Sequence, residues 1–236
     1  MHATTQALME NILRPQETDR LIAHCSSIAD HLGFDYFAYG LRSPLPISSP
    51  RMEMLGNYPD AWQERYKRRK YADIDPAVRH CVNTPVPLLW SCETFQVKDF
   101  AEEAIAHGIR HGVSVCVRDA QGYLGMLTLA RDARPCSAQE FSQLKSAFAL
   151  MGQTAHAALS ERLRQDTVAA PIQELSSRER EVLMWTAEGK TAEEVALIMD
   201  ITKRTVNFHI TNCVTKLDAS NKLHAAVKAA MLGLLS

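Results

Sequence analysis

The hydrophobic positions of this chain repeat with a helical period over much of its length. Residues 17–32, 61–70 and 99–107 are predicted to be helices. A longer helix is predicted to begin at Ser137, where Glu140 follows three residues later as in a capping box. Its apolar side chains return every three or four residues: Phe141, Leu144, Phe148, Met151, Ala155, Leu159 and Leu163. This stripe is long enough to cover a domain or to face a second copy of itself.

Three stretches between these helices have strand patterns. Residues 34–41 are rich in aromatic side chains and follow a glycine, and residues 113–117 alternate along the chain. Residues 119–122 contain turn-forming side chains, and the strand pattern resumes over 123–130, which predicts a hairpin. We therefore expect a sheet with helices on its faces in the first 165 residues.

The character of the chain changes near residue 166. Residues 166–174 are typical of a linker, and the residues after them form short capped helices without a strand pattern. The predicted fold class is α+β, with two domains. Residues 1–165 form an N-terminal α/β/α sandwich with an antiparallel sheet, and residues 175–236 form an all-α domain of four helices.

Two capping boxes begin the first two of these four helices. Ser176 pairs with Glu179, and Thr191 pairs with Glu194. A short break at 200–202 leads into a third helix over 203–217, and a fourth follows over 221–232. Two short helices joined by a tight turn are typical of a helix-turn-helix, whose second helix can enter the major groove of DNA.

The composition is that of an ordinary globular chain of 236 residues, with 46% apolar and 22% charged residues and a net charge of −1. No apolar run approaches the length of a membrane span, and residues 1–30 lack a signal-peptide profile. None of the six cysteines has the CxxC spacing of a zinc or redox site. We expect reduced, mostly buried thiols and a cytoplasmic protein without membrane contact.

The near-zero net charge argues against DNA binding until it is divided along the chain. Residues 174–200 hold three basic and seven acidic side chains, whereas residues 201–236 hold five basic and one acidic. Lys203, Arg204 and Lys216 could neutralise phosphates. Asn207 and Thr211 share a face with Arg204 and could read base edges. The alternative is a solvated charged face on a small helical bundle.

The motifs of this segment resemble the LuxR/NarL-type helix-turn-helix over about residues 175–236. The matching stretches are Leu175 to Leu183, Trp185 to Thr191, Glu194 to Ala196, Thr205 to His209, and Lys216 with Leu217. They include the signature residues of that family at Glu179, Leu183 and Gly189. The resemblance implies transcriptional regulation, usually by a dimer on a two-fold-symmetric site. Thr191 and Thr205 lie within these motifs and join the expected DNA contacts.

Aromatic and polar side chains are dense between residues 57 and 92. Tyr58, Trp62 and Tyr66 recur at intervals of four, Asp75 lies among apolar neighbours, and Trp90 ends an apolar run. One interpretation is an aromatic core patch with a surface aspartate. The other is an apolar cavity with a few polar groups, the usual form of a small-molecule site. A buried carboxylate there requires hydrogen-bond donors, such as a ligand amide.

These residues also resemble the autoinducer-binding domain of quorum-sensing LuxR-type receptors, over roughly residues 5–165. All six hallmark positions are present: Trp62, Tyr66, Asp75, Pro76, Trp90 and Gly112. Residues 74–80 and 107–112 are most similar to the QscR-type orphan receptors. The resemblance implies an N-acyl-homoserine lactone as ligand.

The resemblance also implies roles for individual residues. Trp62 would donate to the lactone carbonyl, Asp75 would accept from the amide N–H, and Tyr58 would donate to the amide carbonyl. Tyr66 and Trp90 would wall the head group.

Four further positions complete the expected ligand site. Thr128, supported by Ser114, would stand near the amide or a 3-oxo group, and Met126 would line the acyl tail. Ala38 offers no hydroxyl where some relatives have one.

The expected partners are promoter DNA, the lactone, a second copy of the chain and RNA polymerase, with no cofactor and no metal. An enzyme is disfavoured because the adjacent pairs His24–Cys25 and His80–Cys81 point in different directions on a helix. His107 and His111 have helical spacing but no third ligand follows them. Two regulator alternatives remain: a phosphorylation-driven response regulator, and a LuxR-type solo regulator that senses a non-lactone small molecule.

Overall fold

The computed structural model describes residues 17–167 and 173–235. The chain divides into two compact units. One comprises Met1–Arg42, Arg51–Arg118 and Leu124–Thr167, and the other comprises Ser43–Pro50, Asp119–Tyr123 and Val168–Ser236. Part of the predicted linker, residues 168–172, lies outside the described residues, and the long helix continues to residue 167.

The first unit is built on one antiparallel sheet of five strands. They are β1 (Tyr36–Arg42), β2 (Met52–Gly56), β3 (Leu88–Ser91), β4 (His111–Arg118) and β5 (Leu124–Arg131). Their order across the sheet is β2-β1-β5-β4-β3. The predicted hairpin is confirmed as β4–β5, in which Val113 opposes Leu129. The strand predicted over 34–41 is confirmed as β1.

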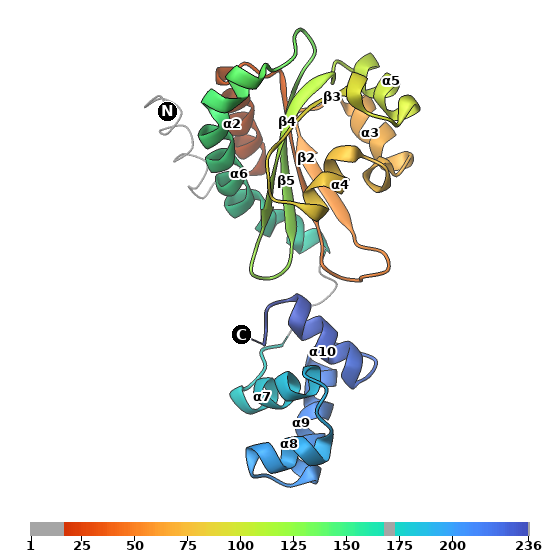
Figure 1. Cartoon of the computed structure of the whole chain (residues 1–236), viewed down its shortest axis with the longest axis vertical. Helices are drawn as coiled ribbons and strands as arrows, with labels where there is room; N and C mark the ends of the chain where they lie inside the picture. The colour runs from red at the N-terminus through yellow and green to blue at the C-terminus, as the bar shows by residue number, and fades with distance from the viewer. Residues whose placement is uncertain (1–16, 168–172, 236) are drawn as a thin grey trace. The chain divides into compact units, whose positions relative to one another are not determined.

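Helices cover both faces of this sheet, so the α/β/α sandwich is confirmed (Figure 1). One face carries α2 (Thr18–His31) and α6 (Ala138–Thr167). The other carries α3 (Asp60–Arg68), α4 (Pro76–Asn83) and α5 (Lys98–Ala106), with the short 3-10 turns η1 (Tyr71–Asp73) and η2 (Cys92–Thr94) between them.

The apolar stripe of α6 packs on the sheet. Phe148, Met151 and Leu159 are fully buried, and the Phe148 ring meets Phe34 edge-on with centroids 5.7 Å apart. The Tyr39 hydroxyl of β1 hydrogen-bonds to Nδ1 of His156 at 2.8 Å. Of the two uses predicted for this stripe, covering its own domain is the one observed.

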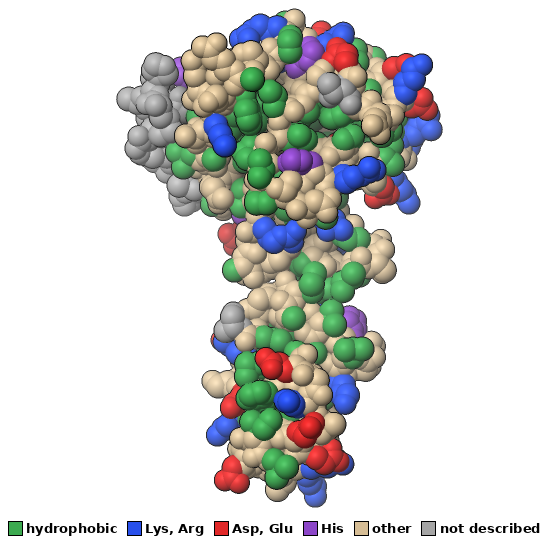
Figure 2. All heavy atoms as spheres, in the orientation of Figure 1, with side chains coloured by type: hydrophobic (Ala, Val, Ile, Leu, Met, Phe, Trp, Pro, Cys, Tyr) green, Lys and Arg blue, Asp and Glu red, His purple; other side chains and the backbone are tan. Residues whose placement is uncertain are grey.

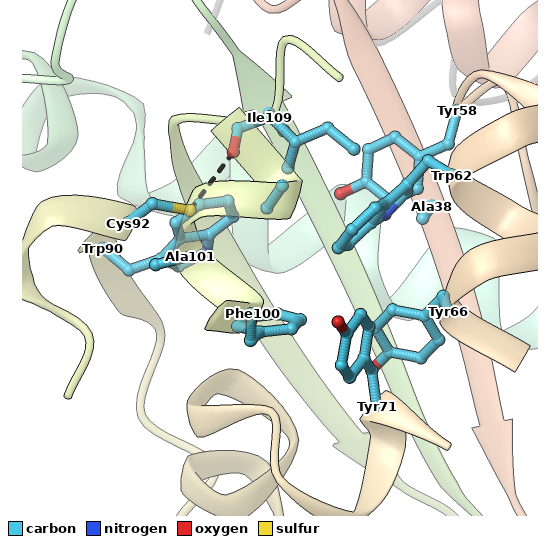
Figure 3. Close-up of a cluster of buried hydrophobic side chains, with 12 residues drawn as sticks. Ala38, Tyr58, Trp62, Tyr66, Tyr71, Trp90, Cys92, Phe100, Ala101 and Ile109 are labelled. Carbon is cyan, nitrogen blue, oxygen red and sulfur yellow. Dashed lines mark hydrogen bonds between the residues drawn. The ribbon is translucent and has the colours of Figure 1, made fainter. Parts of the chain in front are cut away.

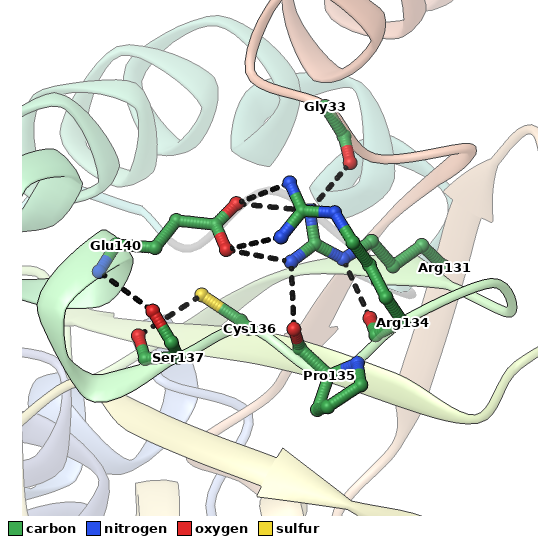
Figure 4. Close-up of polar contacts among 7 residues, drawn as sticks. All are labelled: Gly33, Arg131, Arg134, Pro135, Cys136, Ser137 and Glu140. Carbon is green, nitrogen blue, oxygen red and sulfur yellow. Dashed lines mark hydrogen bonds and ion pairs between the residues drawn. The ribbon is translucent and has the colours of Figure 1, made fainter.

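The capping box predicted at the start of α6 is only half formed. The Ser137 hydroxyl accepts from the Glu140 amide at 3.1 Å. The Glu140 carboxylate binds Arg131 and Arg134 instead of returning to the cap (Figure 4). Arg131 is 3% exposed, so pairing this guanidinium avoids the cost of an isolated buried charge.

The expectation of reduced cysteines is wrong for two of the six. Cys81 of α4 and Cys116 of β4 form a disulfide with Cα atoms 5.4 Å apart. Thirty-five residues separate them in sequence, and only the packing of α4 on β4 brings them together. Cys25, Cys92, Cys136 and Cys213 are free and buried.

The second unit contains the four predicted helices: α7 (Ser177–Ala187), α8 (Ala192–Met199), α9 (Lys203–Lys216) and α10 (Lys222–Met231). Both capping boxes form, at Ser176 and Thr191. Gly189 adopts φ +85°, a left-handed conformation that suits glycine at the end of α7. No described helix is long and apolar enough to cross a membrane.

Candidate functional site

The first unit encloses an apolar cavity of about 40 Å³ between the sheet and α3–α5. Eight of the nine predicted ligand-site residues line it: Ala38, Tyr58, Trp62, Tyr66, Asp75, Trp90, Met126 and Thr128. Figure 3 shows Trp62 and Tyr66 of α3 together with Tyr71 of η1 and Phe100 of α5 in the cluster of buried side chains that contains five of these eight residues. The cavity holds only a water or two, so a larger ligand requires side chains to move.

Helix α3 supplies the aromatic wall. Trp62 and Tyr66 are four residues apart on one face, are 2% and 9% exposed, and have ring centroids 5.8 Å apart. Tyr58 lies before the helix, and its ring faces Tyr36 of β1 at 5.9 Å. The periodicity that suggested either a core patch or a cavity therefore describes a core cluster that borders a cavity.

Asp75 is the N-cap of α4, and Pro76 occupies the first turn of that helix. One carboxylate oxygen accepts from the Ala77 amide at 2.7 Å, and the other accepts from the Tyr66 hydroxyl at 2.9 Å. Burial raises the pKa of Asp75 above its ordinary value, although the hydrogen bonds from Tyr66, Ala77 and Val78 oppose that shift. The carboxylate is thus under-solvated and can accept a further donor.

The opposite wall is a chain of hydrogen bonds across three strands. The Trp90 indole N–H donates to the Ser114 hydroxyl at 3.0 Å, and Ser114 and Thr128 hydrogen-bond to each other at 3.0 Å. Ser114 does not line the cavity but supports two residues that do. A side chain at Gly112 would lie 2.3 Å from the Trp90 ring, which explains the glycine at this position.

Two further residues that line the cavity carry hydrogen-bond donors, the indole N–H of Trp62 and the hydroxyl of Tyr58. The Tyr58 hydroxyl is buried and close enough to the Asp75 carboxylate to feel its charge. Burial, with that charge, raises the pKa of Tyr58 and keeps the phenol protonated. The cavity therefore offers two donors and one acceptor to a ligand.

Further residues of β1, β2, α5 and the segments on either side of α5 also line the cavity and were not predicted. The main ones are Gly40, Met52, Met54, Phe95, Phe100 and Ile109. Residues 52–56 do not show a clear strand alternation, and their place beside Ala38 follows from strand pairing. The recurrence of methionine at 52, 54 and 126 was the available signal for a deformable apolar lining.

The second unit presents the predicted DNA-reading face. Arg204, Asn207 and Thr211 lie on one side of α9, and all three are exposed. Thr205 is half-buried and its amide donates to the Thr202 hydroxyl that caps α9. Basic and acidic side chains lie side by side over the α7–α10 unit on the face shown in Figure 2.

Three other predicted DNA contacts have partners within the unit. Lys216 donates to the Glu179 carboxylate at 2.7 Å and to the Glu174 carbonyl at 3.0 Å. Lys203 pairs with Glu193 of α8. Thr191 caps α8. A phosphate contact by either lysine therefore requires exchange of an existing partner.

The geometry gives little support to a catalytic His–Cys pair or to a metal site at His107 and His111. Nδ1 of His107 contacts the Glu103 carbonyl and Nδ1 of His111 contacts the Ser91 hydroxyl. Cys81, beside His80, is in the disulfide. The described residues contain no group of three or more His, Cys, Asp or Glu placed to hold a metal.

Comparison with known proteins assigns both units. Residues 17–159 match the autoinducer binding domain, and residues 173–229 match the luxR family of bacterial regulatory proteins. The transcriptional activator protein AnoR of Acinetobacter nosocomialis is 42% identical over 238 residues, which covers the full length of both chains.

Solved structures agree with this assignment. The structure of SdiA, a regulatory protein of Escherichia coli, in complex with octanoyl-rac-glycerol has a TM-score of 0.83 and 32% identity, and the match covers 99% of this chain and 96% of SdiA. The N-acylhomoserine-lactone-dependent factor CepR2 of Burkholderia cenocepacia has a TM-score of 0.64 and 34% identity, covering 71% of this chain and 97% of CepR2. The chain belongs to the LuxR family of transcriptional regulators, with an autoinducer-binding and a DNA-binding domain.

Proposed function

We propose that the chain is a receptor for an N-acyl-homoserine lactone which, as a homodimer in the cytoplasm, binds a two-fold-symmetric promoter site and acts on RNA polymerase. The domain boundaries proposed for this function are 1–165 and 175–236. Ligand would enter the cavity of the first, and α9 of the second would read DNA.

The observation that carries this proposal is the polar composition of the cavity. An acyl-homoserine lactone presents one amide N–H, an amide carbonyl and a lactone carbonyl. The Asp75 carboxylate can accept from the N–H, and the Tyr58 hydroxyl and the Trp62 indole N–H can donate to the two carbonyls. Apart from Tyr66 and Thr128, the remaining lining is apolar and suits an acyl chain.

A regulator that senses a non-lactone molecule is the second candidate. SdiA has been solved with octanoyl-rac-glycerol, an acyl compound without an amide or a lactone. Such a ligand would leave the Asp75 carboxylate without an N–H donor, although its hydroxyl groups could donate instead. The two ligand classes therefore differ mainly in what they offer to Asp75.

The test is co-purification of ligand with the full chain. The protein is expressed with an equal mixture of N-octanoyl-homoserine lactone, N-3-oxo-octanoyl-homoserine lactone and octanoyl-glycerol, and extracts of the purified protein are analysed by mass spectrometry. We expect an intact lactone in about one equivalent per chain, and gel-shift binding of promoter DNA that increases with lactone.

Other outcomes distinguish the alternatives. Retention of octanoyl-glycerol in preference to both lactones would support the second candidate. A ring-opened lactone in the medium would indicate hydrolysis. Sedimentation of the lactone-bound protein as a monomer would contradict the proposed homodimer.

A further inference from the structure

Different interactions fix the different walls of the cavity in place. The sheet that forms its floor is held by main-chain hydrogen bonds between strands. Helix α4 is tied to β4 by the Cys81–Cys116 disulfide. Helices α3 and α5 have no such tie, and within the described residues their direct polar contact is the ion pair between Arg65 and Glu103.

This ion pair lies beside the cavity-facing sides of α3 and α5. Arg65 is three residues from Trp62 on α3, and Glu103 is three residues from Phe100 on α5; Trp62 and Phe100 line the cavity. The guanidinium binds the carboxylate with two hydrogen bonds, one of them 2.6 Å long from Nε. The Tyr71 hydroxyl donates to the same carboxylate at 2.7 Å.

Beneath the ion pair, aromatic rings of α3, η1 and α5 pack against one another. Phe100 lies 5.1 Å from Tyr71, 5.8 Å from Trp62 and 6.4 Å from Tyr66, centroid to centroid. Ring pairs can exchange one favourable packing geometry for another after a shift, whereas a bidentate ion pair is held in one geometry. The cavity is also too small for an acyl ligand unless a wall moves.

We propose that Arg65, Glu103 and Tyr71 form a latch across the seam between α3 and α5, and that opening of this latch admits small molecules to the cavity. The proposal deepens the ligand binding proposed above, on which it rests, by naming the residues that control ligand exchange. These residues are positioning residues, since none of the three lines the cavity.

The latch predicts a particular pattern of sensitivity to salt. The side chains of Arg65 and Glu103 are 28% and 26% exposed, so salt screens their attraction in part. Opening should be more frequent at high salt in the wild-type protein. In a variant without the pair, opening should be frequent at all salt concentrations.

A buried thiol makes opening measurable without any ligand. Cys92 lines the cavity and is 2% exposed, and Cys25 is a fully buried residue of α2, on the other face of the sheet. Modification by N-ethylmaleimide is followed for each cysteine by peptide mass spectrometry. Faster modification of Cys92 alone reports opening of the cavity, whereas faster modification of Cys25 as well reports loosening of the whole domain. The experiment uses the full chain without ligand.

Glu103→Gln is the test variant and Glu102→Gln is its matched control. Glu102 is the neighbouring residue of α5 and pairs with Lys98 of the same helix. We expect Glu103→Gln to raise the modification rate of Cys92 about two- to fivefold, the range for a partly exposed ion pair, with Cys25 unchanged. The exchanged pair Arg65→Glu with Glu103→Arg should restore the slow rate.

Ligand kinetics provide the second measurement. N-Octanoyl-homoserine lactone is mixed with each protein, and quenching of Trp62 and Trp90 fluorescence is followed by stopped flow. Loss of a latch should raise the association and dissociation rates together and leave Kd nearly unchanged. Loss of structure would raise the dissociation rate alone and weaken Kd.

The outcomes separate the latch from the proposed function. Faster Cys92 modification with no lactone binding by the wild-type protein would support the latch and overturn the lactone proposal. Unchanged Cys92 and lactone rates in Glu103→Gln would overturn the latch. Equal acceleration of Cys92 and Cys25, or no recovery in the exchanged pair, would also overturn it.

Discussion

Burial of the Asp75 carboxylate lowers the stability of the ligand-free domain. Asp75 is 8% exposed, and within the described residues its carboxylate forms no ion pair and accepts hydrogen bonds from the Tyr66 hydroxyl and the Ala77 amide. Because burial raises its pKa, the folded chain binds a proton more tightly there than the unfolded chain. Stability of the empty domain therefore falls as pH rises from the ordinary Asp pKa through the raised one.

Replacing Asp75 with Asn separates stability from function. Asn removes the buried charge and can still cap α4, so the empty variant should melt at an equal or higher temperature at pH 7. Lactone affinity should fall roughly tenfold or more, because the hydrogen bond to a charged acceptor is lost. Thermal melts and titrations with N-octanoyl-homoserine lactone check both changes.

A reporter strain completes that test. In the Asp75→Asn variant, ligand-dependent activation should be lost, while the helix-turn-helix domain should remain folded. An unchanged lactone response would rule out the assignment of Asp75 to the ligand amide.

In the second unit, an ion pair between Glu179 and Lys216 ties α7 to the end of α9. Glu179 belongs to α7 and is 4% exposed, and its carboxylate accepts from Lys216 at the end of α9 and from the Ser176 amide. Burial opposes ionisation, but the hydrogen bonds from Lys216 and Ser176 prevail and lower the pKa of Glu179 to about 2. The position of α9 relative to α7 thus depends on a residue that the family motif contains.

Glu179→Gln should destabilise the second unit at neutral pH by about 2 kcal/mol, since hydrogen bonds to a charged group are lost. The depressed pKa adds stability above the ordinary Glu value of 4.5, and this stability is lost as pH falls from there to about 2. The variant should therefore approach the wild type at pH 2–3. Denaturant unfolding at pH 7 and pH 3 measures the difference.

Glu181→Gln is the control for this change. Glu181 belongs to the same helix, its side chain is 42% exposed, and it pairs with Arg178. Its loss should change stability by under about 0.5 kcal/mol at either pH. Equal destabilisation by both variants would contradict the role given to Glu179.

The net charge of −1 conceals an unequal distribution over the whole molecule. The five cations of residues 201–236 are the charges available to DNA, but Lys203 and Lys216 pair with glutamates and Lys228 donates to two backbone carbonyls. Few cations remain without an intramolecular partner. We therefore expect DNA affinity to depend on salt with a modest slope.

Arg204 and Asn207 should affect DNA binding in different ways. Arg204→Gln should weaken binding to specific and random DNA alike and reduce the slope of log K against log salt by about 1 per subunit. Asn207→Ala should cost about 1–3 kcal/mol on the specific site alone. Fluorescence anisotropy with both DNAs over a salt series tests this, and an unchanged slope in Arg204→Gln would count against a phosphate contact.

Local signals in the sequence defined the helices, the hairpin and the helix-turn-helix. Capping at Ser176 and Thr191, and the stripe of α6, act within a few residues, so the printed sequence displays them directly. The family resemblance added the ligand residues, and eight of nine lie around one cavity. Strand β2, strand β3 and helix α4 were missed, because they are short and their patterns are weak.

The tertiary structure determined the contacts between residues that lie far apart in the sequence. Sheet register placed Met52 and Met54 in the cavity. Helix packing joined Cys81 to Cys116, Arg65 to Glu103 and Lys216 to Glu179. Each of these contacts joins residues that are separated by many positions in the sequence. A side chain's periodicity defines the face on which it lies, but its partner depends on which elements pack together, and that information exists only in the folded chain.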